Sequence, residues 1–386
     1  MSAAERYTID KAEFDTLLEL LRTQGYSIIG PTVRDQAIVY DEIADSRDLP
    51  IGWTDEQGPG SYRLKRRGDD AWFGFSSGPH SWKKYLFPPR LRLFQITREG
   101  GPIAGCRLEA AEPRPPRYAF VGVRACELAA LDIQDRVLDR EMADPYYAAA
   151  RRDALVIAVQ CTAPGGTCFC RSMGTGPRCD AGFDLALTEL PGSFVVCIGS
   201  QRGAGLLAKL NHRVSDANEV RLADLLLDEA AMHMGRELDV RDLPEILLSS
   251  PDHPQWQRVA ERCLACANCT LACPTCFCTS IEDATDVTGE HAERVRSWGS
   301  CFTLEFSYHT GGYGRSSTRA RYRQWLTHKL AGWWEQFGTS GCVGCGRCIT
   351  WCPVGIDLTR EARAIADDVR VSRLNHARRE HEEAYP

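Results

Sequence analysis

The sequence has no apolar run of the roughly 18–20 residues that are needed to span a bilayer. Its first ten residues, Met1–Asp10, contain no basic segment followed by an apolar one, so they do not resemble a secretory signal peptide. Lysine and arginine (46) are fewer than aspartate and glutamate (52), and the net charge of −6 argues against a nucleic-acid-binding protein. These absences predict a cytoplasmic protein with no membrane span and no nucleic-acid partner.

The signatures of common nucleotide-dependent and metal-dependent enzymes are also missing. There is no Walker A loop, no H-E-x-x-H pattern and no complete G-x-G-x-x-G on a strand–helix turn. Gly203–Gly205 follows a strand-like run, but the third glycine of a dinucleotide-binding motif is absent. No pair of residues stands out as a nucleophile and its base. The sequence therefore predicts no catalytic residue of its own.

What the sequence has in excess is cysteine, with 18 in 386 residues. Ordinary core packing does not need so many, and the cytosol keeps thiols reduced, so structural disulfides do not explain them. Metal binding, redox chemistry or both remain. The spacing of the cysteines distinguishes between these possibilities.

The first half of the chain has the pattern of an α/β fold. Apolar residues at Phe14, Leu17, Leu18 and Leu21 predict an amphipathic helix, capped by Asp10 and closed by Gly25. Strands are expected at 26–30, 36–43, 71–75, 90–97, 118–123, 154–160 and 193–199, and helices at 127–138, 203–211 and 216–234. Strands that alternate with helices favour a mostly parallel sheet.

A turn-rich segment, Ser249–Pro254, separates this half from a region of different composition. We predict an α/β domain over 1–245 and a helical, ferredoxin-like domain over 246–386, with an insert at 274–341. The insert contains a basic stretch with two aromatic residues, made up of Arg315, Arg319, Arg321, Tyr322, Arg323, Trp325 and Lys329. It predicts a docking face or positive charge beside a reduced cluster, or else a solvated helix face with an apolar side.

Two motifs in the second half have the spacing C-x₂-C-x₂-C-x₃-C-P, which is typical of bacterial [4Fe–4S] ferredoxins. Zinc sites usually show pairs of C-x₂-C rather than complete quartets, so the spacing disfavours zinc. In two-cluster ferredoxins the fourth cysteine of each motif binds the other cluster. The predicted ligands of the first cluster are therefore Cys263, Cys266, Cys269 and Cys352, and those of the second are Cys342, Cys345, Cys348 and Cys273. The spacing assigns no role to Cys276, Cys278 or Cys301.

Four cysteines in the first half predict a third [4Fe–4S] cluster. Cys126 and Cys161 each follow a predicted buried strand, and open α/β sheets collect ligands at strand ends. Cys168 and Cys170 lie in a loop rich in glycine and proline, whose amides can turn toward cluster sulfurs. Cys179 is the substitute if one of these four is not a ligand. The alternative is that these cysteines are small buried hydrophobic residues.

Several of these motifs occur together in one known family. They are VGVRACE at Val121–Glu127, the loop TCFC…MGTGP at 167–177, and WGSC at Trp298–Cys301 between the two cluster motifs. The combination, from about residue 20 to residue 360, resembles the iron–sulfur β subunit of cytosolic NAD(P)-linked [NiFe] hydrogenases, the sulfhydrogenases. An iron–sulfur component of anaerobic sulfite reductases is similar. Glu127 stands where the family pattern has aspartate.

The resemblance implies an electron-transfer subunit that is not catalytic alone. Such a β subunit relays electrons between a partner that binds flavin and NAD(P) and the small and large subunits of a [NiFe] hydrogenase. FAD, NAD(P) and the NiFe centre are then expected in partner subunits only. The alternatives are the equivalent subunit of a sulfite or sulfur reductase, and a stand-alone iron–sulfur carrier or redox sensor. An α/β domain of about 245 residues exceeds what a simple carrier needs.

Overall fold

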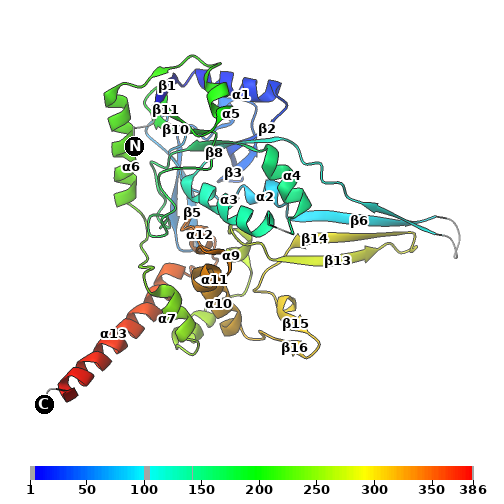
Figure 1. The fold of residues 1–386 in the computed structure, drawn as a ribbon, viewed down its shortest axis with the longest axis vertical. Coiled ribbons are helices and arrows are strands. Elements are labelled where there is room, and N and C mark those ends of the chain that lie inside the picture. Colours follow the sequence, from blue (N-terminus) through cyan, green and yellow to red (C-terminus); the bar gives the residue numbers. More distant parts are fainter. Residues whose placement is uncertain (1–4, 100–104, 141, 385–386) are drawn as a thin grey trace.

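A mixed sheet lies at the centre of the α/β part of the molecule (Figure 1). The computed structural model describes residues 5–99, 105–140 and 142–384, so residues 1–4 of the N-terminal segment considered above lie outside it. No helix in these ranges is long and apolar enough to cross a membrane. In spatial order the strands are β12 (Arg213–Val214), β1 (Tyr7–Asp10), β11 (Ser193–Ile198), β10 (Leu185–Leu190), β9 (Leu155–Val159), β8 (Tyr118–Val123), β2 (Ser27–Arg34) and β3 (Ala37–Glu42).

The strand directions correct the expectation of a mostly parallel sheet. Strands β2, β8, β9 and β10 are parallel, whereas the outer pairings are antiparallel. The reason lies in two short connections, because antiparallel neighbours need only a two-residue turn. Asp35 and Gln36 join β2 to β3, both with positive φ (48° and 58°), and Pro191 and Gly192 join β10 to β11. These turns reverse the chain without the helical crossover that a parallel connection needs.

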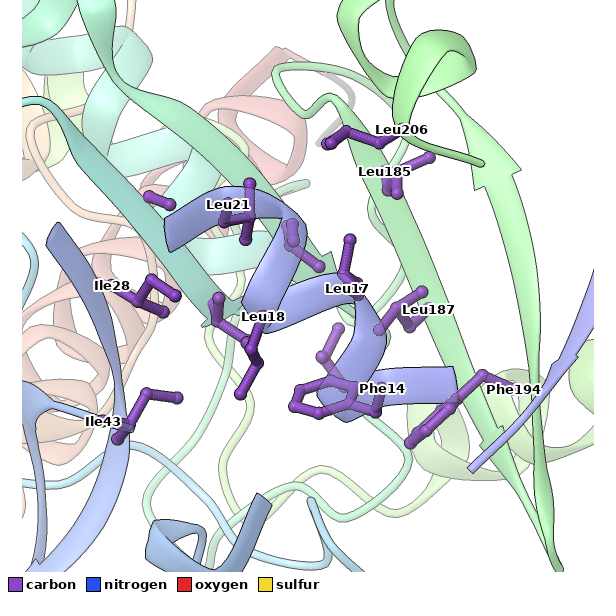
Figure 2. Packing of buried hydrophobic residues seen from close by; sticks show 14 of the residues in the cluster. Phe14, Leu17, Leu18, Leu21, Ile28, Ile43, Leu185, Leu187, Phe194 and Leu206 are labelled. Atoms are coloured by element: carbon purple, nitrogen blue, oxygen red, sulfur yellow. The ribbon is translucent and has the colours of Figure 1, made fainter. Parts of the chain in front are cut away.

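The apolar stripe predicted for the first helix is confirmed. Helix α1 (Glu13–Thr23) buries its four apolar residues, Phe14, Leu17, Leu18 and Leu21, in the core. Figure 2 shows Phe14 and Leu17 near Leu187 and Phe194 of the sheet. The predicted cap is wrong, because the residue before the helix is Ala12 and Asp10 belongs to β1. Gly25 follows the helix with φ of 81°, as expected for a residue that ends a helix.

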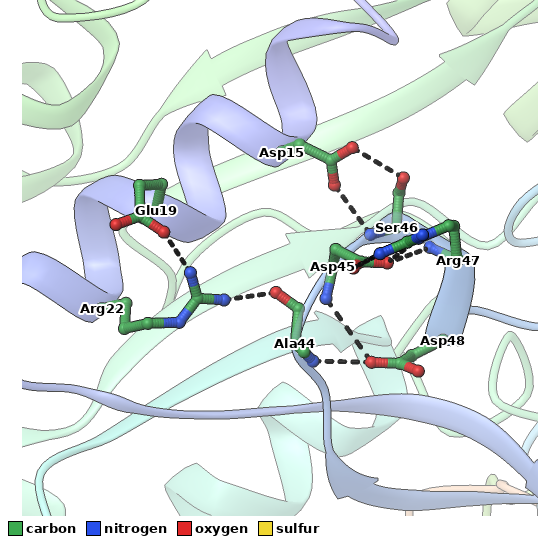
Figure 3. Close-up of polar contacts among 8 residues, drawn as sticks. All are labelled: Asp15, Glu19, Arg22, Ala44, Asp45, Ser46, Arg47 and Asp48. Carbon is green, nitrogen blue, oxygen red and sulfur yellow. Dashed lines mark hydrogen bonds and ion pairs between the residues drawn. The ribbon is translucent and has the colours of Figure 1, made fainter.

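The outer side of α1 is tied to the loop after β3 (Figure 3). The Asp15 carboxylate accepts hydrogen bonds from the Ser46 amide (2.7 Å) and hydroxyl (2.9 Å). Arg22 pairs with Glu19 and donates to the carbonyl of Ala44. These contacts hold the helix across one face of the sheet, while its apolar side fills the core beneath.

Residues 71–75 were expected to form a strand but have no regular secondary structure. Phe73 and Phe75 are buried, and their alternation with other residues is the pattern that predicted a strand. Side chains satisfy its backbone in place of a neighbouring strand: Glu189 accepts from the amides of Trp72 and Phe73, and Arg124 donates to the carbonyls of Phe73 and Phe75. The pattern of buried residues therefore predicts burial correctly and strand pairing wrongly.

A second sheet extends away from the body in Figure 1. Its order is β13 (Thr279–Thr285), β14 (His291–Trp298), β6 (Arg90–Arg98) and β7 (Cys106–Ala110). The strand expected at 90–97 is thus confirmed as β6, in this sheet. The insert supplies β13 and β14, so the sheet joins residues from both sides of the turn-rich segment 249–254.

The helices fall into two sets. The first half contains α2 (Lys83–Leu86), α3 (Ala125–Leu138), α4 (Pro145–Asp153), α5 (Gln201–Leu207) and α6 (Ala217–Met232), of which α3, α5 and α6 match the helices predicted from the sequence. The second half contains α7 (Leu243–Ser249), α8 (Gln255–Ala260), α9 (Asn268–Leu271), α10 (Thr318–Thr327), α11 (Trp333–Phe337), α12 (Arg347–Thr350) and α13 (Leu358–Ala384). Two small hairpins, β4 (Trp53–Gly58) with β5 (Ser61–Arg66) and β15 (Tyr308–His309) with β16 (Gly312–Tyr313), complete the fold.

Candidate iron–sulfur centres

The first cysteine group consists of Cys263, Cys266, Cys269 and Cys352, and all four residues line one cavity. The loop Cys263–Cys269 leads into α9, and Cys352 follows α12. The two helices are linked by a hydrogen bond from the Asn268 side chain to the Trp351 carbonyl (3.2 Å). A cysteine of the second motif therefore stands with three cysteines of the first. Cys348 also reaches this cavity.

The second cysteine group consists of Cys342, Cys345, Cys348 and Cys273. Burial, together with Cys342, Cys345 and Cys273, raises the pKa of the Cys348 thiol well above its usual value. This mutual effect arises because the four sulfur atoms are close enough to repel one another when ionised. Lys329 opposes that repulsion, since its buried ammonium group donates to the Cys273 sulfur at 3.2 Å.

The third cysteine group consists of Cys126, Cys161, Cys168 and Cys170. Cys126 is in the first turn of α3, and Cys161 comes just after β9. Burial and the neighbouring Cys161 raise the pKa of Cys168 to about 12. Burial, Cys168 and Cys161 raise the pKa of Cys170, and burial and Cys170 raise the pKa of Cys126. The structure therefore brings together the four residues that the sequence proposed.

Cys179, the alternative to these four, lies beside Cys161 but has protein partners of its own. Its thiol donates to the Val159 carbonyl at 3.8 Å, and its amide donates to the Gln160 side chain at 2.8 Å. Within the described ranges, no three His, Cys, Asp or Glu side chains converge on the space of a single metal ion.

The third group lies directly against the second, because two loops pack backbone to backbone. The Phe169 amide donates to the Gly344 carbonyl (2.8 Å), and the Thr175 hydroxyl donates to the Val343 carbonyl (2.7 Å). Gly344 has φ of 65°, and a Cβ there would come within 2.6 Å of the Phe169 and Cys170 backbone. A residue with a side chain would push the loops apart. Cys348 of the second group also lines the cavity of the first group. The second group therefore lies between the first and the third.

A buried ion pair lies between the second and third groups. Arg347 and Glu127 pair at 2.6 Å, with 0% and 1% of their side chains exposed. Glu127 also accepts from the Tyr40 hydroxyl (2.7 Å) and the Trp82 indole (2.9 Å). The second terminal nitrogen of Arg347, Nη1, is buried and has no hydrogen-bond partner among the residues that the structure describes. A buried donor needs an acceptor, and an anionic cluster beside Cys345 fits that need.

The basic stretch of the insert divides between two environments. Arg319 forms an ion pair with Asp252 (3.0 Å), and Arg323 donates to the Pro251 carbonyl (2.6 Å). Lys329, in contrast, is buried and contacts Cys273. Positive charge beside a predicted cluster ligand is therefore present at Lys329. Sequence reasoning did not identify Arg347, although a basic residue inside the second cysteine motif was a usable signal.

Comparison with known proteins agrees with this geometry. A family model for a 4Fe-4S dicluster domain matches residues 262–356. The "Sulfhydrogenase 2 subunit beta" of Pyrococcus furiosus is 31% identical over 292 residues, which is 75% of this chain and 82% of that protein. No solved structure matches the chain.

The α/β body and the dicluster domain define an iron–sulfur protein of the ferredoxin-like class. More specifically, the chain belongs to the family of sulfhydrogenase β subunits.

Proposed function

We propose that the chain relays electrons through three [4Fe–4S] clusters, one held by each cysteine group. The observation that carries the proposal is the contiguity of the groups: the first and second share Cys348 at the wall of one cavity, and the second and third meet at Gly344. A [4Fe–4S] cluster supplies one-electron redox chemistry between thiolate ligands. The residues would hold the clusters in the crossed pattern, with Cys352 serving the first cluster and Cys273 the second.

The residues around the cysteine groups are suited to a cluster whose charge changes when it gains or loses an electron. Lys329 and Arg347 place buried positive charge beside Cys273 and Cys345. Such charge favours the reduced, more negative state of a neighbouring cluster. Apolar side chains, including Phe302 and Trp325, line the first cavity.

In this proposal the chain is one part of a larger cytoplasmic oxidoreductase. One end of the relay would meet a flavin- and NAD(P)-binding subunit, and the other the small and large subunits of a [NiFe] hydrogenase. Membership of the sulfhydrogenase β-subunit family supports these partners. Nickel in the copurified complex would distinguish a hydrogenase from a sulfite reductase, which would contain sirohaem.

Replacing Cys170 with alanine tests the third cluster. The anaerobically purified chain is expected to contain about twelve iron atoms, and the variant about eight, because one cube loses a ligand. Iron and acid-labile sulfide are measured together. The matched control is Cys197→Ala, a half-buried cysteine in β11, which is expected to keep all the iron. A wild-type count of about eight iron atoms would remove the third cluster from the proposal.

Replacing Cys345 with alanine in the assembled complex tests the relay. Hydrogen-dependent reduction of NAD(P) is expected to be abolished, because the path through the second cluster is broken. Reduction of an artificial dye that takes electrons from the small-subunit clusters is expected to survive. The two activities are assayed on the same preparation after its size has been checked. Survival of both activities in a complex shown to lack the cluster would contradict the relay and leave a scaffold role.

A further inference from the structure

Three cysteines in the insert belong to none of the three groups, namely Cys276, Cys278 and Cys301. The base of the β13–β14 hairpin brings two of them together. Thr279 pairs with Trp298, and the Gly299 amide donates to the Cys278 carbonyl at 2.8 Å. Cys278 therefore precedes one strand and Cys301 follows the other, at the same end of the hairpin.

The side chains of Cys278 and Cys301 are close enough to shift each other's pKa. Cys301, through its side chain and its amide, lowers the pKa of Cys278, and Cys278 in turn raises the pKa of Cys301. Both residues are partly exposed. The Ser300 side chain fixes this turn, since its hydroxyl bonds the Thr270 hydroxyl of α9 at 2.8 Å. This end of the hairpin is thus attached to the helix that carries Cys269.

Two buried lysines face the pair. Lys329 contacts Cys273, and Lys83 donates to the Cys276 carbonyl at 3.1 Å with its ammonium group 3.8 Å from the centre of the Trp298 ring. Neither lysine forms an ion pair with a carboxylate in the described part of the chain. A buried cation without a carboxylate requires another source of negative charge, and the Cys278 sulfur lies in the field of both lysines.

We propose that Cys278 and Cys301 form a reversible dithiol/disulfide couple that stores two electrons beside the cluster relay. The proposal rests on the proposed function, because the reductant is the reduced iron–sulfur clusters of this chain. In the oxidised state the two sulfur atoms share a bond. That bond breaks when the pair accepts two electrons, one at a time, from the clusters, which are oxidised. Two protons from water complete the two thiols, and the reverse reaction returns the electrons.

The local chemistry supports an exchange couple of this kind. The neighbouring Cys301 side chain, followed by the positive charge of Lys329, lowers the pKa of Cys278 to about 7, although burial opposes the shift. Reactive dithiols typically combine one thiolate stabilised by positive charge with a neighbouring thiol.

Differential alkylation of the wild-type chain with its clusters tests the couple without a mutation. Free thiols are blocked anaerobically with a light reagent during denaturation, disulfides are then reduced, and the new thiols take a heavy reagent. Peptide mass spectrometry is expected to find the heavy label on both Cys278 and Cys301 in the oxidised protein, and the light label on both after reduction by dithionite. The light label in both states, or the heavy label in both, would overturn the proposal.

Reductive titration of Cys301→Ser supplies a second measurement. The variant is expected to keep its iron and to take up about two electrons fewer per chain than the wild type, because a disulfide is a two-electron couple. Cys197→Ser, the matched control, should take up as many electrons as the wild type. The difference does not depend on how many clusters the chain holds, so it separates this proposal from the relay. An unchanged uptake, or loss of iron from Cys301→Ser, would overturn it.

Discussion

Alanine at position 352 will remove the cluster at the loop Cys263–Cys269 and leave the cluster at the loop Cys342–Cys348 in place. The reason is that Cys352, although it belongs to the second motif, lines the cavity formed by the first loop. Iron is expected to fall by about four atoms per chain. Electron paramagnetic resonance of the reduced protein should lose one signal, which the variant Cys263→Ala should lose as well.

The mirror variant, Cys273→Ala, provides the control for this crossing. It is expected to remove the signal that Cys342→Ala removes, because Cys273 lies with the second group and contacts Lys329. The crossed assignment is wrong if Cys352→Ala and Cys342→Ala lose the same signal. Each variant is compared at equal protein concentration, after gel filtration has shown a folded chain.

Replacing Glu127 with glutamine is expected to destabilise the protein by about 3–5 kcal/mol, because it leaves the buried Arg347 charge without its partner. The temperature at which the chain releases its iron is a suitable measure, since cluster loss makes unfolding irreversible. This temperature should fall by several degrees. Two elements from opposite halves of the chain, α3 and α12, lose their charged link.

Two further variants show whether the effect belongs to the buried pair. Glu127→Asp keeps the negative charge and introduces the residue of the family pattern, so it should retain most of the stability. Asp242→Asn breaks an exposed ion pair with Arg370 and should leave the temperature of iron release nearly unchanged. A Glu127→Gln protein as stable as the wild type would show that the pair contributes nothing to the stability of the fold.

Much of the candidate site could be predicted from the sequence, because iron–sulfur ligation imposes a strict spacing on the cysteines. The family model for a 4Fe-4S dicluster domain matches residues 262–356, which is the region that this spacing predicts. The stripe from Phe14 to Leu21 likewise predicted its helix, since burial on one face requires that period. The ligand assignments of Cys126, Cys161, Cys168 and Cys170 stay a prediction, although the structure brings these residues together.

Other features depend on partners that are distant in the sequence. Buried Phe73 and Phe75 look like strand residues, yet Glu189 and Arg124 satisfy the backbone of this segment. The burial of Lys329 depends on packing across the insert, and local hydropathy gives no sign of it. A single sequence records which residues are apolar, but it does not record which distant polar group will meet a given amide.

The pairing of β6 with β14 also constrains when the protein can be assembled. Arg90 and Glu293, in contact across these strands, are separated by 203 positions. Contacts between such distant residues form late, because the intervening chain must first lose much of its freedom. During synthesis the α/β body can begin to fold while the insert is still inside the ribosome. The second sheet must wait for β14, and the loop Cys342–Cys348 emerges later still. The first and second cysteine groups are therefore complete only after nearly the whole chain has been translated, and a truncated product would leave the edge of β6 open to aggregation.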